Sequence, residues 1–598
     1  MTDRFASCFD PFVLPFLMGM VFVLLYCIIG VIRIIGQLSS LERKNLIMSL
    51  VNPVDILINI RDIFLDCLLH VRLWKRNRLL GYMHSSIAFG WFLLIIVGHL
   101  EVLFLLPNRS FYLYYPIFFK YFAVETTQNP FHTYLFLLMD VILIYILSGI
   151  ILAIYKRMHS RLFGMRRTPQ HSLINRIGMY ALWTIFPLRL IAEVLISHVS
   201  VEASIPFWWA YSISLSVFLM LLPFSRYMHI PAEMFLIPLR NAGIRMSSAR
   251  KGFASVQILS CPSCGVCIDA CPMTADKSNL IDTTVYLNRQ LRSGNEARIR
   301  EISDKCLLCG KCKEVCQVGL DGAQLRILAR GEREYDVTLN SSAIHTEELI
   351  PHGSKVLYYS GCMSKLVPSI GKSVVSILRN AGIDFIWVDR DNGVCCGRPL
   401  FMAGRQKEAM ELVRKNEVLF KTSGADMMVV SCPICYRMFT EQYDLNPMKV
   451  VHYIHFMEDL ISSHAISVER SDICYVYHDP CELGRGCGIY NEPRRLLGRI
   501  ANVAEADKNQ SESVCCGGSL GSISISFPKR EKLTKAALKN LYTSNADAIA
   551  TACPLCLATF SRYADRPVWD IAEIVDSLMV KKIQIDHAEI RENKIPSC

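Results

Sequence analysis

The sequence lacks a glycine-rich nucleotide-binding fingerprint, since no G-x-G-x-x-G stretch occurs in its 598 residues. A flavin would therefore have to arrive on a partner protein. The carboxylates and histidines also offer no arrangement that predicts an acid–base dyad. Charged residues make up only 20% of the chain, against 52% hydrophobic residues. That balance is too apolar for soluble cores alone, so part of the chain should lie in lipid.

Long apolar runs are confined to the first 230 residues. A membrane-spanning helix needs about 20 mostly apolar residues, and five windows qualify: 11–36, 81–106, 131–155, 178–200 and 207–230. The first window is too long for a signal peptide and has no evident small-residue cleavage site, so we interpret it as an anchor. Residues 53–73 repeat apolar groups at helical spacing among charges, as an interfacial helix would.

The net charge of +11 indicates membrane orientation and not a nucleic-acid partner, because much of the basic excess lies in two loops between apolar windows. These basic residues are Arg43, Lys44, Arg61, Arg72, Lys75, Arg76, Arg78, Lys156, Arg157, Arg161, Arg166, Arg167 and Arg176. The opposite segments carry only Arg109 and Lys120. By the positive-inside rule, the amino terminus is outside and everything after residue 230 is cytoplasmic. We expect a multi-pass protein of the cytoplasmic (inner) membrane.

Histidines near the ends of the apolar windows predict haem ligands. His84 and His229 fall near the cytoplasmic ends of the second and fifth helices, where they could hold one haem iron from opposite faces. His99 stands about 22 Å further out along the second helix, and His198 in the fourth helix matches its level. One or two b-type haems would thus carry electrons across the membrane.

Other polar residues of this region leave alternatives open. His132 competes with His198 for the outer haem site, and we interpret His70, His159 and His171 as surface residues. Asp140, Arg189 and Glu193 lie inside predicted spans, where ionisable groups are costly. They either pair with each other or with haem propionates, or they belong to a quinone site.

The 24 cysteines recur as C-x-x-C groups and Cys-Cys-Gly triplets, which favours thiolate metal ligands in a reducing compartment over disulfides. Residues 261–271 and 306–316 both read C-x-x-C-x-x-C-x-x-x-C. In such pairs three thiolates hold one cubane and the fourth reaches the other cluster, whereas zinc would not use the extra cysteine. The predicted [4Fe–4S] ligand sets are Cys261, Cys264, Cys267 with Cys316, and Cys306, Cys309, Cys312 with Cys271.

Two features of this module depart from the usual ferredoxin pattern. Gln317 stands where proline is usual, and 34 residues separate the two motifs. The long, helix-compatible insert predicts an α-helical ferredoxin domain.

A second cysteine pattern occurs twice in the last 250 residues. In each copy 32 or 33 residues lie between a first cysteine and a Cys-Cys-Gly triplet, and 34 or 35 more lie between the triplet and a Cys-Pro-x-Cys group. The apolar segments 355–359 and 473–477 match as strands, so we expect a small α/β fold with cysteines at strand ends. Five cysteines exceed what a cubane needs. Either the extra thiolate bridges irons or leaves a site for substrate sulfur, or it only packs beside a conventional cluster.

The repeat resembles the CCG-domain subunits of heterodisulfide reductase and their relatives, which include the sulfite-reduction-associated membrane complex and the iron–sulfur subunits of glycerol-3-phosphate and lactate dehydrogenases. The first 230 residues are similar to the cytochrome b subunit of membrane-bound heterodisulfide reductase, or to the nitrate reductase gamma-like family. Residues 255–598 are similar to the catalytic iron–sulfur subunit of that reductase.

The resemblance implies a noncubane [4Fe–4S] cluster at each complete motif, with a disulfide substrate between the two clusters. It assigns as catalytic ligands Cys362, Cys395, Cys396, Cys432 and Cys435 in the first copy, and Cys481, Cys515, Cys516, Cys553 and Cys556 in the second. The cysteines outside the motifs are expected to be buried thiols: Cys8, Cys27, Cys67, Cys474, Cys487 and Cys598.

These patterns predict a multidomain chain. An all-α transmembrane five-helix bundle is expected at 1–235, an α-helical dicluster ferredoxin domain at 250–335, and two repeated α/β CCG domains at 350–465 and 470–580. The leading hypothesis is a thiol–disulfide oxidoreductase linked to a membrane quinone or phenazine. Its electrons would pass through the haems, two cubanes and one or two noncubane clusters.

Two alternatives remain open at this stage. The chain could be an electron conduit that links a partner flavoprotein dehydrogenase to the quinone pool. It could also act in sulfur relay, with a trisulfide on a small carrier protein as the substrate.

Overall fold

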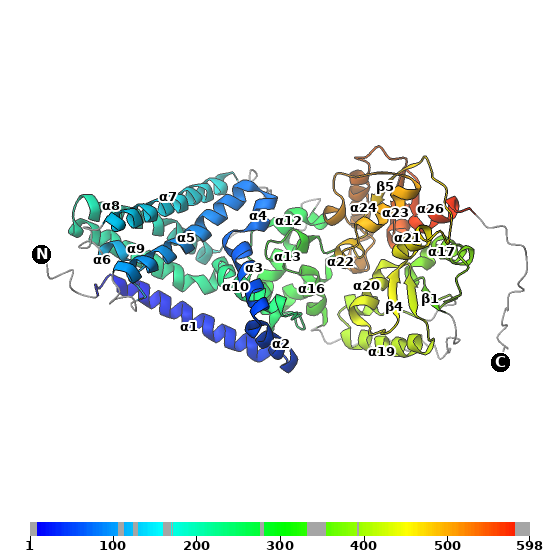
Figure 1. The fold of residues 1–598 in the computed structure, drawn as a ribbon, viewed down its shortest axis with the longest axis horizontal. Helices are drawn as coiled ribbons and strands as arrows, with labels where there is room; N and C mark the ends of the chain where they lie inside the picture. Colours follow the sequence, from blue (N-terminus) through cyan, green and yellow to red (C-terminus); the bar gives the residue numbers. More distant parts are fainter. Residues whose placement is uncertain are drawn as a thin grey trace, which may run out of the picture. The chain divides into compact units, whose positions relative to one another are not determined.

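The computed structural model describes residues 9–105, 113–122, 130–159, 169, 172–274, 280–331, 355–390 and 394–580. The chain forms two compact units, one made of residues 1–302 and 315–329, the other of residues 303–314 and 330–598. The first unit holds long helices and a smaller helical region, and the second holds two sheets flanked by helices (Figure 1). The predicted fold class is therefore confirmed.

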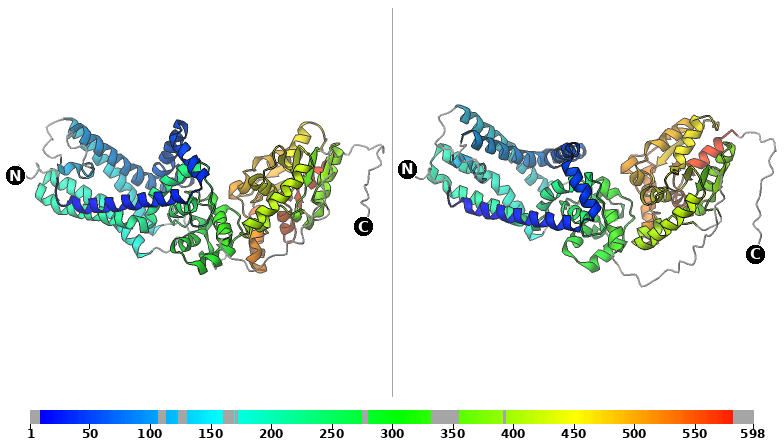
Figure 2. Two further views of the ribbon diagram at one scale, coloured as in Figure 1. Left: turned by 90° about the horizontal axis from the view of Figure 1, so that it is seen from below. Right: turned by 60° about the horizontal axis from the view of Figure 1, so that its bottom comes forward.

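Five helices of the first unit are long and apolar enough to cross a membrane. They are α1 (Val13–Gln37), α5 (Arg78–Leu105), α7 (Pro130–Met158), α8 (Leu173–His198) and α9 (Val201–Leu221). Helix α9 packs against α1 and α8, while α5 packs against α7, and Figure 2 shows the long helices running alongside one another. The fully buried Trp208 on α9 contacts the rings of Phe12, Phe118 and Tyr211 in their shared core.

The fifth long helix does not match the predicted window at 207–230. Ser200 caps it, because its hydroxyl oxygen accepts a hydrogen bond from a backbone N–H of the first turn at 3.1 Å. Pro223 lacks a backbone N–H and so cannot continue the helix, which ends at Leu221. His229 consequently begins a separate helix, α10 (His229–Asn241), and does not lie at the end of the fifth span.

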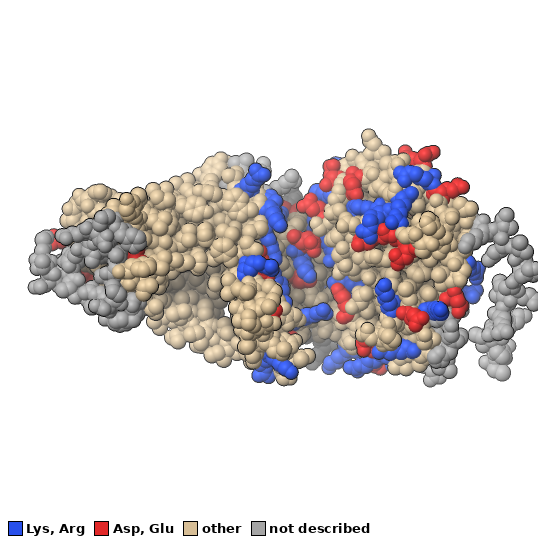
Figure 3. Space-filling view, viewed as in Figure 1, with Lys and Arg blue, Asp and Glu red and all other residues tan. Residues whose placement is uncertain are grey.

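Short helices gather at one end of the long ones. They are α2 (Ser40–Val51), α3 (Pro53–Ile63) and α4 (Val71–Arg76), with α6 (Phe119–Phe122) elsewhere in the unit. The predicted interfacial helix at 53–73 is broken, because His70 adopts a left-handed backbone conformation with φ of 53° that a right-handed helix cannot include. In Figure 3 Lys and Arg gather over α2–α4, while the visible face of the long helices is nearly free of charge.

A small helical region completes the first unit. Its helices are α11 (Phe253–Leu259), α12 (Val266–Ala270), α13 (Thr284–Ser293), α14 (Glu296–Asp304) and α16 (Gly322–Gly331). They enclose a core that includes Ile258, Leu287 and Leu325. The buried Arg326 donates a hydrogen bond to the carbonyl oxygen of Asp282 at 2.6 Å, which ties α16 to the turn before α13.

The second unit contains two four-stranded parallel sheets with equivalent strand orders, β2-β1-β3-β4 and β6-β5-β7-β8. The first comprises β1 (Val356–Tyr359), β2 (Phe385–Trp387), β3 (Met427–Val430) and β4 (Lys449–His452). The second comprises β5 (Cys474–His478), β6 (Asn502–Ala504), β7 (Ala548–Thr551) and β8 (Val568–Asp570). In register, β1 pairs Val356 with both Phe385 and Met427, and β5 pairs Tyr475 with Ala548.

Helices connect the strands of both sheets and cover them. In the first α/β domain these are α17 (Pro368–Asn380), α18 (Arg398–Met402), α19 (Gln406–Thr422), α20 (Pro433–Gln442) and α21 (Tyr453–Ser462). In the second they are α22 (Gly484–Cys487), α23 (Asn491–Ile500), α24 (Phe527–Leu541), α25 (Pro554–Phe560) and α26 (Ile571–Leu578). The same unit includes α15 (Lys311–Glu314).

The two α/β domains exchange equivalent contacts. In each domain the helix after the first strand packs against the helix that follows the fourth strand of the other domain, so α17 meets α26 and α23 meets α21. Such reciprocal contacts are typical of a twofold relation. The apolar faces merge into one core, and across it the Tyr453 hydroxyl donates a hydrogen bond to Asp570 at 2.7 Å.

Candidate metal centres and membrane site

The cysteines of the first repeat lie at the carboxyl edge of the first sheet, where open parallel sheets bind their ligands. Cys362 follows β1, and Cys432 follows β3. Cys395 and Cys396 lie in the loop between β2 and α18, and Cys435 lies in the first turn of α20. We call these five residues the first CCG site.

The five thiols of the first CCG site converge. Gly361, with φ of +86°, lets the chain pass so close that a Cβ there would lie 2.7 Å from the Cys432 Cβ and 3.1 Å from the Cys435 Sγ. Hydrogen bonds from the Cys395 and Cys435 thiols hold the pKa of Cys396 well below its usual range. One thiolate is therefore favoured before metal binds, and a convergent set of five sulfurs fits an iron–sulfur cluster.

Buried polar groups hold the loops of this site in place. The carboxylate of Asp389 accepts hydrogen bonds from the backbone N–H groups of Ser360 at 2.8 Å and of Gly361 at 2.6 Å, just before the first cysteine. The side-chain amide of Asn416 donates to the Cys395 carbonyl oxygen at 2.8 Å. These contacts fix the backbone on both sides of the thiols, so the geometry does not depend on the thiols alone.

The second repeat builds the same arrangement on the second sheet, and we call it the second CCG site. Its cysteines follow β5, lie in the loop after β6, follow β7 and begin α25: Cys481, Cys515, Cys516, Cys553 and Cys556. The Cys556 thiol donates to the Cys516 sulfur at 3.3 Å. The ligand atoms of Cys516, Cys556 and His478 all lie within 4.8 Å of one another. His478 was not among the predicted site residues.

The two CCG sites adjoin. Cys553 of the second and Cys432 of the first are near enough to interact electrostatically. Residues of both domains line a pocket beside the second site, with a volume of about 20 Å³, among them Met402, Cys516 and Cys556. That is room for about one water molecule.

A buried ion-pair cluster links the two CCG sites. The carboxylate of Glu482, next to Cys481, contacts Arg398 at 3.2 Å and Arg437 at 3.1 Å. Arg398 is only 3% exposed and follows the Cys-Cys-Gly triplet of the first site. The guanidinium groups keep the pKa of the buried Glu482 below its usual value, although burial opposes this.

The second ferredoxin-type motif also packs against the second CCG site within the same unit. A hydrogen bond with the Cys515 thiol, aided by the charges of Arg485 and Lys311, lowers the pKa of Cys309 to about 6. Arg485 donates to the Cys309 carbonyl oxygen at 2.7 Å and to the Ser513 carbonyl oxygen at 3.0 Å. No local spacing signals this contact, because it joins residues more than 200 positions apart in the sequence.

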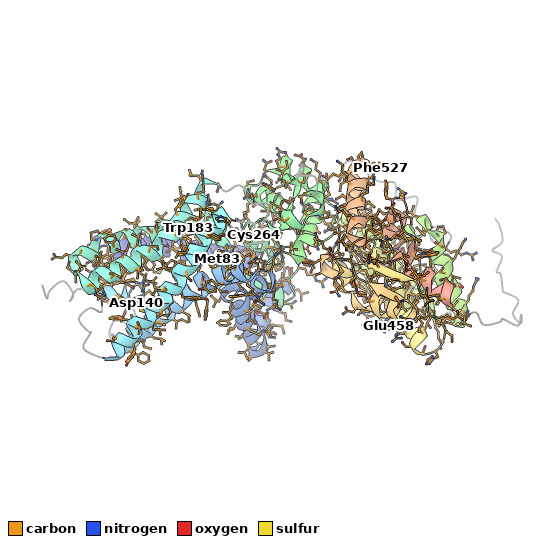
Figure 4. All side chains as sticks on the ribbon, turned by 90° about the horizontal axis from the view of Figure 1, so that it is seen from above. Met83, Asp140, Trp183, Cys264, Glu458 and Phe527 are labelled. Atoms are coloured by element: carbon orange, nitrogen blue, oxygen red, sulfur yellow. The ribbon has the colours of Figure 1, made fainter. Side chains whose placement is uncertain are left out.

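The first ferredoxin-type motif lies in the first unit. Cys261 and Cys264 interact electrostatically with Cys316, and burial raises the pKa of the Cys316 thiol. The structure thus brings together three of the four cysteines predicted for this cubane. Arg292 donates to the Cys261 carbonyl oxygen at 3.2 Å, and Figure 4 shows Cys264 beside Met83 of α5, with which it shares an apolar cluster. The second cubane, with Cys271, stays a prediction from the spacing.

Three histidines meet near this motif. The rings of His70 and His84 lie 5.3 Å apart, and His229 is close enough to act electrostatically on both. Burial lowers the pKa of His229 to about 4 and also lowers that of His70. Neutral imidazoles are what a metal needs. The Nδ1 of His229 contacts the Arg226 carbonyl oxygen at 2.7 Å, which leaves its Nε2 free for a metal.

The interpretation of His70 as a surface residue is wrong, since its half-buried ring faces His84.

The two histidines predicted for the outer haem are not brought into a buried site. His99 and His198 are both exposed, and the His99 ring contacts only a carbonyl oxygen of its own helix among the described hydrogen bonds. The side chains of His132 and His171, and the residues Arg109, Arg161, Arg166, Arg167, Cys8 and Cys598, lie outside the described residues. His159 is exposed.

The ionisable residues of the spans do pair with each other. Arg189 contacts Glu193 at 2.8 Å, and Lys120 contacts Asp140 at 2.6 Å and Glu193 at 3.5 Å. Glu101 on α5 is 0% exposed, and neither of its carboxylate oxygens has a hydrogen-bond partner among the described residues. The charged groups that act on Glu101 are those of Arg189, Glu193, Lys120 and Asp140. Three carboxylates thus share two cations in an apolar bundle.

The remaining cysteines vary in burial. Cys67 is buried, and burial raises its pKa. Cys27, Cys474 and Cys487 are half-buried, and burial raises the pKa of Cys487 to about 12.

The two cysteine-bearing sheets and the helical dicluster region define an iron–sulfur protein. Residues 356–440 and 475–561 each match the family model of the cysteine-rich domain (CCG), and residues 257–320 match the model of the 4Fe-4S dicluster domain.

The chain is distantly homologous to components of two oxidoreductases of methanogens. It is 25% identical over 368 residues to the D component of the dihydromethanophenazine:CoB–CoM heterodisulfide reductase of Methanosarcina acetivorans, a match that covers 51% of this chain and 90% of that protein. It is also 25% identical over 360 residues to the B component of the fumarate reductase (CoM/CoB) of Methanothermobacter marburgensis, which covers 53% of this chain and 72% of that protein.

A third relative is the EtfAB:quinone oxidoreductase of Syntrophomonas wolfei. The identity is 24% over 345 residues, and the match covers 54% of this chain and 46% of that protein. Among solved structures, an aspartate racemase homologue from Pyrococcus horikoshii matches 38% of this chain and 96% of its own, at 12% identity and a TM-score of 0.21. A TM-score this low says nothing about the fold of this chain.

Proposed function

We propose that this protein is a membrane-bound oxidoreductase that moves electrons between a quinone-type carrier and a thiol–disulfide substrate bound at the paired CCG sites. The observation that carries the proposal is the meeting of two complete five-cysteine sets where the two CCG domains join. A pure relay would need neither the fifth thiol nor the junction. Similarity to a component of a heterodisulfide reductase supports the same substrate class.

The reaction consumes two electrons and two protons for each disulfide, RSSR′ + 2e⁻ + 2H⁺ → RSH + R′SH, and it can run in reverse. Bound iron–sulfur clusters would supply the electrons one at a time. The chain's own residues hold the ten sulfurs at the edges of the two sheets. Glu482 and its two arginines fix the relative position of the two domains, and hence of the two sites.

The route of the electrons is part of the proposal. The contact between Cys309 and Cys515 supports entry at the second CCG site. In the first unit, His84 and His229 would hold one b-type haem near Cys261 and Cys264, and Arg292 lies close to both His229 and Cys261. The membrane orientation with the iron–sulfur domains on the cytoplasmic side follows from the distribution of basic residues.

A buried carboxylate supports a carrier site in the bundle. Oxidation of a quinol releases protons, and the carboxylate of Glu101, which has no hydrogen-bond partner within the described part of the chain, lies near the pairs of Lys120 and Arg189. Intramembrane ionisable residues are functional-site candidates by default. Figure 4 marks Asp140, a member of this cluster, on α7.

The test uses the full protein in lipid vesicles. Adding thiol or disulfide substrates to the reduced protein should produce a new electron paramagnetic resonance signal from a CCG cluster, and quinol should drive disulfide reduction. Glu101→Gln should slow the quinol-driven rate about a hundredfold and leave the dithionite-driven rate unchanged. The absence of any substrate-induced signal, together with activity that requires an added flavoprotein, would reject the proposal.

That last outcome would favour the second candidate, an electron conduit from a partner flavoprotein to the quinone pool. The similarity to an EtfAB:quinone oxidoreductase is the observation in its favour. In that case the junction of the CCG sites would bind no substrate, and both CCG sites would titrate identically with and without thiols.

A further inference from the structure

The two CCG sites differ at one buried position. When the repeats are aligned on Cys362 and Cys481, Tyr359 at the end of β1 corresponds to His478 at the end of β5. Tyr359 is fully buried, and its hydroxyl donates a hydrogen bond to the Val394 carbonyl oxygen at 2.7 Å. The Tyr359 hydroxyl is therefore used within the loop of its own domain and donates no hydrogen bond to the thiols of the first site.

The Nε2 atom of His478 makes no equivalent hydrogen bond among the described residues. His478 is only 3% exposed. Its ring packs edge-on against Phe560 at 4.7 Å. Buried polar atoms in native proteins nearly always have a partner, and an unmet one points to a missing ion or water.

A ring nitrogen of His478 also lies among the thiols of the second site, where His478 hydrogen-bonds with Cys516. Its ligand nitrogen and the sulfurs of Cys516 and Cys556 lie within 4.8 Å of one another, and all three residues are buried. Imidazole nitrogen and thiolate sulfur are both ligands of iron in clusters. A ring nitrogen and two sulfurs this close together form a ligand group that fits metal.

We propose that His478 supplies a nitrogen ligand to the iron–sulfur cluster of the second CCG site, beside Cys516 and Cys556. The two CCG clusters are then chemically different, one held by sulfur alone and the other by sulfur and nitrogen. At that iron the imidazole takes the place of one of the site's other thiolates, which removes negative charge from the cluster and raises its reduction potential. Electrons that arrive through the contact at Cys515 therefore reduce the cluster of the second site in preference to that of the first. This inference rests on the proposed presence of clusters in both CCG domains.

The experiment is pulsed electron–nuclear spectroscopy on the purified full chain, grown with ¹⁵N-histidine, in the redox state in which the second CCG cluster is paramagnetic. The expected result is a histidine nitrogen coupling of the size found for direct coordination. His478→Tyr places at this position the residue that the equivalent backbone of the first site already accommodates. It should abolish the coupling and shift the midpoint potential of this cluster to a more negative value.

The control is His452→Gln, which removes a fully buried histidine at the end of β4 and should leave the coupling unchanged. A wild-type protein with a full iron content and no histidine coupling at the second cluster would overturn the inference. Iron analysis separates the two hypotheses. If the second CCG domain holds no iron in the wild type, the proposed function fails, whereas iron without nitrogen coupling removes only the role of His478.

Discussion

Asp570 provides a test of the packing between the two CCG domains. Its carboxylate ends β8, accepts hydrogen bonds from the Ala572 N–H and the Tyr453 hydroxyl, and is fully buried. Burial raises its pKa from 3.8 to about 7. The folded protein therefore holds a proton that the unfolded chain releases above pH 4, and stability falls as pH rises from 4 to 7.

The magnitude follows from that shift. Roughly three pKa units correspond to about 4 kcal/mol, lost at about 1.4 kcal/mol per pH unit and constant above pH 7. Asp570→Asn keeps an acceptor for both donors and cannot ionise. From pH 5 to 7 the variant should gain about 2.7 kcal/mol relative to the wild type, and the two should be equally stable at pH 4.

The assay is hydrogen–deuterium exchange of α26 as a function of pH, corrected for the intrinsic exchange rate. Protection of α26 should fall with rising pH in the wild type and stay level in Asp570→Asn. Parallel pH profiles for the two proteins would refute the reasoning, because the carboxyl group would then have the same pKa in the folded and unfolded states.

Three further predictions concern the ligands and the junction. Glu482→Gln removes the carboxylate that Arg398 and Arg437 share. Arg437 keeps Glu441 at 2.9 Å, whereas the buried Arg398 keeps only a contact with Glu441 at 3.9 Å, so the change should cost about 3 kcal/mol and lower the unfolding temperature; an unchanged temperature would contradict the ion-pair cluster. Cys396→Ala should remove about 4 of the about 16 iron atoms that four clusters hold per chain, haem iron apart, whereas Cys487→Ala should remove none, and equal iron contents would reject the ligand set. His84→Ala and His229→Ala should each lower the haem content measured in the optical spectrum of the dithionite-reduced protein. Unchanged haem in both would exclude this pair as ligands.

Much of the fold was predictable because the signals are local. Apolar windows predict long helices, and the repeated spacing around Cys362 and Cys481 predicts two α/β domains with thiols at strand ends. In parallel sheets those ends share one edge, so five cysteines scattered over 74 residues in the first copy meet by topology. The pattern of strands in the sequence is therefore enough to predict that these cysteines lie together.

What could not be predicted depends either on packing between segments far apart in the sequence or on an unusual backbone conformation. The contact of Cys309 with Cys515 has no local signature, and neither does the ring contact of His70 with His84. His70 reaches that place through a left-handed backbone conformation, which non-glycine residues rarely adopt. His478 was overlooked because it ends a strand, where a histidine more often only packs. Its one signal was its position three residues before Cys481.

The reciprocal helix contacts of the two CCG domains bear on how the chain arose. A lone domain would expose the apolar faces of the helices after its first and fourth strands, the faces that α17 and α21 bury against α26 and α23. Two identical copies could cover those faces by associating in the same way, so an ancestral single-domain protein would have been a homodimer. Duplication and fusion of its gene would free the two halves from that identity, so that a tyrosine in one half can correspond to a histidine in the other.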